Sequence, residues 1–190
     1  MLEQEQINQL ASAISDIDNE EVDELYPKIV NLIANKLNAL YVELYFVNSS
    51  KNLALPRAGS GEIGKIFAKH DHNCYLKVHN EFTTQIGPVI VLGKVRVVDW
   101  KLGEITAYTL HPKLSKSYEQ SHSTVVADTP PLFWRPELGG AKQEIYLPIR
   151  SSNENVGALA LYFTESIISS NDEIYLLQRI ADCIGDLENS

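Results

Sequence analysis

Histidine and cysteine side chains gather in one short stretch of this chain, and these residue types are well suited to chemistry. The stretch contains His70, His72 and Cys74 and is followed by His79. Imidazole and thiolate groups bind zinc and haem iron, so these four residues are candidate metal ligands. Their spacing matches no closed structural zinc pattern, and a polar surface loop is the alternative interpretation. We therefore expect no metal, and we keep a cysteine- and histidine-based redox or metal-dependent function centred on Cys74 as an alternative hypothesis.

A second set of candidates lies in the long segment from Lys101 to Gly140, which proline and glycine interrupt too often for one long element. Segments of this kind are binding loops, lids or disordered stretches. Aromatic rings beside an arginine can stack on and clamp a planar anionic ligand. The candidate ligand-binding residues are Tyr108, His111, Trp134 and Arg135, together with Tyr146 from the next strand. The alternative for Phe133 and Trp134 is that they anchor a loop to the core.

Charge and composition exclude several classes of protein. The chain has 25 acidic and 16 basic residues, a net charge of -9, which disfavours binding to the phosphates of nucleic acid. Its N-terminus is acidic, and no run approaches about 18 apolar residues, so we expect neither a signal peptide nor a membrane partner. The two cysteines form no CxxC pair, which favours a reducing compartment and a cytoplasmic location. Ser121 and His122 lack an acid partner, and no catalytic constellation is found, so we expect no enzyme.

Apolar periodicity predicts the elements that must position these side chains. Apolar residues at helical spacing predict an N-terminal helix within residues 1–19 and a second helix that ends near Asn38. The β-formers of 41–47 and 53–58 predict a hairpin, and 62–69 predicts a short helix. The run from Gly87 is ambiguous between strand and buried helix in its first half, and 95–100 predicts a strand.

The clearest pattern is in the last quarter of the chain. Two strands, 142–149 and 155–163, meet across the polar turn 151–154. Along the first of them, aliphatic residues alternate with Glu144 and Tyr146, so one face is aliphatic and the other offers polar and aromatic contacts. A helix over 170–188 follows, with Ser170 and Glu173 as a capping box.

This last quarter resembles a GAF domain, a small-molecule-binding and dimerising module of sensory proteins. The resemblance rests on the strand Glu144-Ile-Tyr-Leu-Pro-Ile, the polar turn, Val156-Gly157-Ala158-Leu159 and the capped helix. The stretch 93–99 also looks like the family's Gly-Lys-Pro-Val-x-Val-x-Asp strand, with Val95 in place of the proline. The resemblance implies an α+β fold with a central antiparallel sheet of about six strands. Terminal helices would cover one face, and loops and short helices would lie over a cavity on the other, within a single domain spanning 1–190 with a core over 20–190.

The function implied by the resemblance is sensory or regulatory: binding of a small molecule, dimerisation, or both. The cofactor stays unknown, because Cys74 is followed by Tyr75 where bilin-binding relatives commonly have histidine, and the signature of cyclic-nucleotide binders is incomplete. A homodimer through the terminal helices would pack the apolar stripe of Ile7, Leu10 and Ile14 against that of the last helix. The alternative is that these stripes cap their own sheet. A ligand-free dimerisation scaffold with a filled cavity is a further hypothesis.

Overall fold

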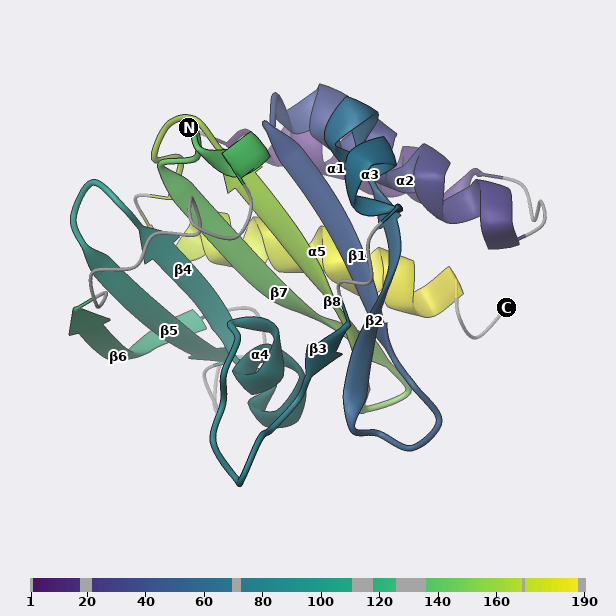
Figure 1. Cartoon of the computed structure of the whole chain (residues 1–190). Helices are drawn as coiled ribbons and strands as arrows, with labels where there is room; N and C mark the ends of the chain where they lie inside the picture. Colours follow the sequence, from purple (N-terminus) through teal and green to yellow (C-terminus); the bar gives the residue numbers. More distant parts are fainter. Residues whose placement is uncertain are drawn as a thin grey trace.

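One twisted antiparallel sheet forms the centre of the molecule (Figure 1). In this computed structural model the described residues are 2–17, 22–69, 73–110, 118–125, 136–168 and 170–187. The strands of that described part lie in the order β3-β2-β1-β8-β7-β4-β5-β6, and every neighbouring pair is antiparallel. Their bounds are β1 Tyr41–Val47, β2 Leu53–Gly59, β3 Cys74–Tyr75, β4 Val95–Asp99, β5 Glu104–Leu110, β6 Tyr118–Val125, β7 Gln143–Ser151 and β8 Glu154–Phe163.

The helices lie on both faces of this sheet. Their bounds are α1 Gln4–Ser15, α2 Val22–Leu37, α3 Gly61–Phe67, α4 Ile86–Leu92 and α5 Asn171–Leu187, with a 3-10 turn at Pro136–Leu138. Figure 1 shows α5 behind the sheet and α4 in front of it. None of the helices in the described chain is long and apolar enough to cross a membrane.

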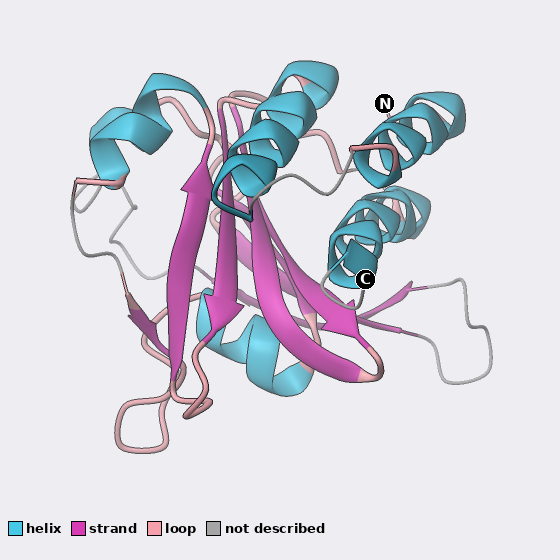
Figure 2. Ribbon diagram, turned by 90° about the vertical axis from the view of Figure 1, so that its right-hand side faces the viewer, coloured by secondary structure: helices cyan, strands magenta, loops and turns pink. Residues whose placement is uncertain are grey.

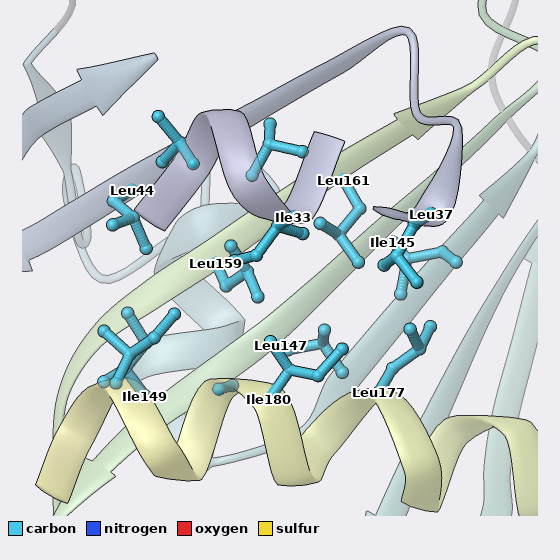
Figure 3. Close-up of a cluster of buried hydrophobic side chains, with 14 of the residues drawn as sticks. Ile33, Leu37, Leu44, Ile145, Leu147, Ile149, Leu159, Leu161, Leu177 and Ile180 are labelled. Carbon is cyan, nitrogen blue, oxygen red and sulfur yellow. The ribbon is translucent and has the colours of Figure 1, made fainter. Parts of the chain in front are cut away.

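The first face of the sheet carries the larger hydrophobic core. Alternate residues of the central strands, such as Ile145 and Leu147 on β7 and Leu159 on β8, pack against α2 and α5 (Figure 3). Leu177 and Ile180 of α5 point into this core and are fully buried. Two-residue periodicity in the strands and helical periodicity in α5 thus meet in one aliphatic layer.

Helix α1 forms an additional layer on this side, because it contacts α5 and α2 (Figure 2). Its apolar stripe of Ile7, Leu10 and Ile14 is 0% exposed within the single chain. The stripe on which the expected homodimer was based is therefore already covered by the chain's own helices. The homodimer stays a prediction, and it would have to use the polar outer surfaces of α1 and α5. Light scattering of the purified protein measures it directly.

Helix α5 approaches the sheet very closely near its C-terminal end. A Cβ atom built on Gly185 would lie 1.8 Å from the carbonyl oxygen of Arg150 on β7. Nearer the N-terminal end of the same helix, the Gln178 side chain donates a hydrogen bond of 2.7 Å to the carbonyl oxygen of Pro148. The helix is thus fixed to β7 both by backbone contact and by a side-chain hydrogen bond.

The second face carries a smaller core that is rich in tyrosine and is covered by α3 and α4. Tyr41 and Tyr45 of β1, Tyr146 of β7 and Tyr162 of β8 all point to this side. Helix α4 lies against β7 and β8, where Ala158 and Ala160 are fully buried. Gly64 lets α3 approach β2 closely, because a Cβ atom there would lie 2.0 Å from the carbonyl oxygen of Gly59.

The expected α+β fold with helices on both faces of an antiparallel sheet is confirmed. The sheet has eight strands in the described residues where about six were expected, since it also contains the two-residue β3 and the pair β5 and β6. The terminal helices α1 and α5 fall within the ranges expected from periodicity. The capping box is formed at least in part, because the backbone N–H of Ser170 donates to Glu173 Oε2 at 3.0 Å.

Candidate ligand-binding site

A cavity of about 480 Å³ lies at one edge of the second face, between β1, β2 and α3. Ligand pockets in proteins typically enclose about 300–1,000 Å³, so this size suits a small molecule. Its lining consists of Tyr41, Glu43, Leu55, Pro56, Arg57, Ala58, Gly59, Gly64, Phe67, Ala68 and Asn73. The lining therefore includes aromatic and aliphatic side chains as well as the polar side chains of Glu43, Arg57 and Asn73.

Glu43 gives the cavity a buried carboxyl group. It lies on β1 directly opposite Gly59 of β2 and is only 1% exposed. A side chain at position 59 would not fit here, since its Cβ atom would lie 2.2 Å from the hydroxyl oxygen of Tyr41. A carboxylate in such low-dielectric surroundings attracts cations and hydrogen-bond donors strongly.

Arg57 lies at the exposed rim of the same cavity. Leu44 pairs with Ala58 and Tyr45 pairs with Pro56, so Arg57 is the extra residue of a β-bulge. Bulges commonly re-aim a side chain next to a functional site. Within the described part of the chain, the guanidinium of Arg57 has no hydrogen bond or ion pair.

A second buried carboxylate, Glu144 on β7, lies on the same face of the sheet. Trp100 Nε1 donates to Glu144 Oε1 at 2.8 Å, and the Tyr146 hydroxyl donates to Glu144 Oε2 at 2.5 Å. The hydroxyl oxygens of Tyr146 and Tyr162 are 3.4 Å apart. Each carboxylate oxygen thus accepts a hydrogen bond from an aromatic side chain, and we interpret the group as a structural network.

Aromatic rings connect this network to the cavity. The ring centroids of Tyr162 and Tyr41 are 5.6 Å apart, and those of Tyr41 and Phe67 are 5.4 Å apart in an edge-to-face arrangement. Rings at these distances attract one another beyond simple burial. The inner wall of the cavity is therefore held by the same packed layer that contains Glu144.

Burial raises the pKa of Tyr146 well above its ordinary value of 10.0, and the neighbouring Glu144 carboxylate raises it further. The unfolded chain ionises this tyrosine near pH 10 while the folded chain keeps it neutral, so folding stability is complete below pH 10 and falls above it. We predict that Tyr146→Phe reduces the loss of unfolding free energy above pH 10 by up to about 1.4 kcal/mol per pH unit. Urea unfolding from pH 8 to 11.5 measures this, with the curves at pH 8 giving the pH-independent cost. Equal slopes in both proteins would contradict the prediction.

A second hollow of about 610 Å³ lies at the end of β4, next to Trp100, Lys101, Lys142, Glu165 and Ser166. Its charged residues Lys101, Lys142 and Glu165 are all exposed. The cavity at Glu43 is the stronger candidate, because its lining contains a buried carboxyl group and the buried rings of Tyr41 and Phe67.

The structure separates the two candidate tyrosines. Tyr146 lies on the second face as the alternation predicts. It is buried there, and its hydroxyl donates a hydrogen bond to Glu144. Tyr108 lies on β5 opposite Val95 and packs against the core of the first face, where burial raises its pKa. Neither residue lines the cavity at Glu43.

The other candidates are only partly covered by the described residues. His70, His72, His111, Trp134 and Arg135 lie outside them. Cys74 is half-buried and pairs with Ala54 at the sheet edge, and His79 lies in an exposed turn with φ of 49°. Among the described residues, no three histidine, cysteine or acidic side chains gather as metal ligands do.

Sequence reasoning missed the residues that form the cavity. Tyr41 and Glu43 were assigned to a β-strand by their neighbours, Arg57 to the second strand of a hairpin, and Gly59 lies just after that expected strand. A signal was present at Glu43, because a charged residue in the middle of an otherwise apolar strand is unusual. The bulge that presents Arg57 left no recognisable pattern.

Comparison with solved structures identifies the fold. The chain resembles the phycoerythrobilin-bound GAF domain of a cyanobacterial phytochrome, with a TM-score of 0.65, 16% identity and coverage of 97% of this chain and 98% of the other. It also resembles an A. aeolicus GAF domain in an inactive state, with a TM-score of 0.63, 13% identity and coverage of 97% and 94%. For a free methionine-R-sulfoxide reductase from Neisseria meningitidis in complex with its substrate, the TM-score is 0.58 and the sequence identity is 12%. The alignment covers 94% of this chain and 83% of the reductase.

No family model and no curated protein matches the sequence. The structural likeness extends over nearly the whole chain, and the neighbours are GAF domain structures. The protein therefore has the fold of a GAF domain, and the expected resemblance is confirmed at the level of structure.

Proposed function

We propose that the protein is a sensory or regulatory domain that binds a small molecule in the cavity at Glu43 and Arg57. The observation that carries this proposal is a cavity of about 480 Å³ with a buried carboxylate in its wall, within a fold whose solved examples include ligand-bound domains. Neither Cys74 nor Cys183 is in a disulfide bond, which agrees with a reducing compartment, and we propose a cytoplasmic location.

A blocked cavity tests this proposal. Ala68 lines the cavity and is exposed at the end of α3, so Ala68→Trp should fill the space without disturbing the core. We expect metabolite pools, nucleotides or haem to raise the melting temperature of the wild type but not of Ala68→Trp. Ser12→Trp, on the exposed surface of α1, is the matched control and should respond as the wild type does. If no compound shifts either protein, ligand sensing loses its support and a ligand-free scaffold is preferred.

We propose that α2 receives the signal, because a direct hydrogen bond joins it to the cavity wall. The backbone N–H of Gly61, at the start of α3, donates to Asn31 Oδ1 at 2.9 Å, and Asn31 Nδ2 donates to the Pro27 carbonyl at 2.7 Å. A ligand that moves α3 would therefore act on α2. Ligand binding would shift the populations of two arrangements of this contact only if it favoured one of them.

Asn31→Ala is predicted to loosen this contact. The substitution removes the acceptor of the Gly61 N–H, and a net hydrogen bond contributes about 1 kcal/mol, or roughly fivefold in an opening equilibrium. Amide hydrogen exchange at Gly61 should accelerate by up to about that factor. Asn35→Ala is the matched control, since Asn35 is an exposed asparagine one turn further along α2. Equal exchange in the two variants would contradict a role for Asn31.

A redox or metal-dependent function centred on Cys74 is the second candidate. The observation in its favour is that Cys74 directly follows Asn73, which lines the cavity. Cys74→Ala, with mass spectrometry for bound metal and a comparison of peroxide consumption, tests it. Wild-type and variant protein that behave alike in both assays leave the binding domain as the preferred function.

A further inference from the structure

We propose that the cavity binds a small zwitterion of the amino-acid type, with its ammonium group at Glu43 and its carboxylate at Arg57. This inference rests on the proposed function, because it names the ligand class of the same cavity. It follows from the kind and depth of the charges that line the cavity.

The inner end of the cavity suits a cation. Glu43 is 1% exposed, so its carboxylate acts through a medium that water screens poorly. The rings of Tyr41 and Phe67 stand edge to face at 5.4 Å in the same wall, and aromatic faces attract cations. A phosphate or carboxylate would be repelled at this end, whereas an ammonium group gains both interactions.

The outer end suits an anion. Arg57 is presented at the exposed rim by the β-bulge, and within the described chain its guanidinium has no partner. A guanidinium binds a carboxylate through two parallel hydrogen bonds. Asn73 at the same rim adds an amide that can donate as well. One cavity thus has a negative inner end and a positive rim.

Beside these two charged groups the cavity also has an apolar lining. Leu55 and Pro56 of β2 contribute to it, together with Phe67 of α3. A ligand side chain located there gains free energy in proportion to the apolar area that it buries, and a third charge would be unpaired. We therefore infer a free amino acid with an uncharged, apolar side chain.

The experiment varies the ligand first. L-leucine, L-methionine and L-phenylalanine are titrated into the wild-type protein by calorimetry. Isopentylamine keeps the ammonium group and side chain of leucine but lacks its carboxylate, and 4-methylpentanoate lacks the ammonium group. We expect at least one amino acid to bind and, where leucine binds, each analogue to bind about tenfold or more weakly, since each loses a charged hydrogen bond. Analogues of the same design replace these two where methionine or phenylalanine binds instead.

Two variants then assign each end. Arg57→Gln should weaken the binding of the amino acid about tenfold and leave the binding of the amine unchanged. Glu43→Gln should weaken the binding of both. Circular dichroism checks that Glu43→Gln folds. Arg57 is exposed, so its variant keeps the test valid if Glu43→Gln does not fold. Lys101→Gln, at an exposed lysine outside the cavity lining, is the matched control for Arg57→Gln and should bind as the wild type does.

The outcomes separate this inference from the function on which it rests. If no amino acid binds but another compound does, and Ala68→Trp abolishes that binding, the zwitterion is overturned and the cavity function stands. If amino acids bind to Arg57→Gln and to Ala68→Trp as tightly as they bind to the wild type, the assignment of the binding site to this cavity is overturned. If nothing binds to the wild type, both proposals fail.

Discussion

Gly185→Ala is expected to lower the free energy of unfolding by about 2–4 kcal/mol, in the range of severe overpacking. The direction is informative, because alanine ordinarily stabilises a helix interior by about 0.5–1 kcal/mol relative to glycine. Here the added methyl group would lie 1.8 Å from the carbonyl oxygen of Arg150, a backbone atom that cannot rotate away. Helix α5 must shift outward, and its contacts with β7 are then lost.

Urea unfolding at neutral pH measures this cost. Gly140→Ala is the matched control, because the nearest atom to its Cβ would be a leucine methyl at 4.0 Å. That variant should unfold within about 0.5 kcal/mol of the wild type, as surface substitutions usually do. A stable Gly185→Ala protein would mean that α5 is less closely seated on the sheet than the structure has it.

Glu144→Leu should be comparably destabilising, by about 2–5 kcal/mol. The leucine side chain fills a similar volume, so the main effect is the loss of an acceptor for two donors, the Nε1 of the half-buried Trp100 and the buried hydroxyl of Tyr146. An unsatisfied buried donor costs about 1–3 kcal/mol. The change should also alter the fluorescence of Trp100, whose indole N–H loses its partner.

A double-variant cycle distinguishes this network from simple packing. Removing the donor as well, in Glu144→Leu with Tyr146→Phe, should restore part of the loss, since replacing both partners by apolar groups is nearly neutral. Tyr146→Phe should therefore cost less in the Glu144→Leu background than in the wild type. Glu165→Leu, at an exposed acid, controls for the change in charge and should have little effect. Additive costs in the cycle would count against the network.

Elements with strong local patterns were predictable from the sequence. The hairpin of β7 and β8 could be predicted because apolar and polar residues alternate along β7 and a polar turn follows it. In the structure Ser152 and Asn153 form a two-residue turn with φ of 50° and 80°. Asp99 at the end of β4 follows the family pattern, and the structure gives the reason: its carboxylate accepts the N–H groups of Lys101 and Leu102, both at 3.0 Å.

Other elements depend on tertiary contacts that a single sequence does not encode legibly. Helix α4 is only seven residues long and apolar throughout, so periodicity could not distinguish it from a buried strand. Its end at Gly93, with φ of 64°, was the usable signal. Strand β5 was missed within the long segment 101–140, although Ile105, Thr106 and Tyr108 are of the β-branched and aromatic types that are common in strands.

The candidate site was harder to predict than the fold. The choice of Tyr108 assumed that its segment lies over the second face, whereas β5 continues the sheet and directs Tyr108 to the first. Glu43 and Arg57 are separated by 14 positions and line one cavity because β1 pairs with β2 and Arg57 is the extra residue of the bulge. Contacts that a register shift creates leave no mark in local spacing.

The alanines of β8 affect where the second face leaves open volume. Ala158 and Ala160 have the smallest side chains on the middle of this face, where α4 packs against the strands. Open volume is left at the margin beside α3. Side chains of another size on that one strand would change the separation between helix and sheet, and so relocate the pocket without altering the topology. Proteins that share this architecture can therefore accommodate chemically unrelated ligands in different places.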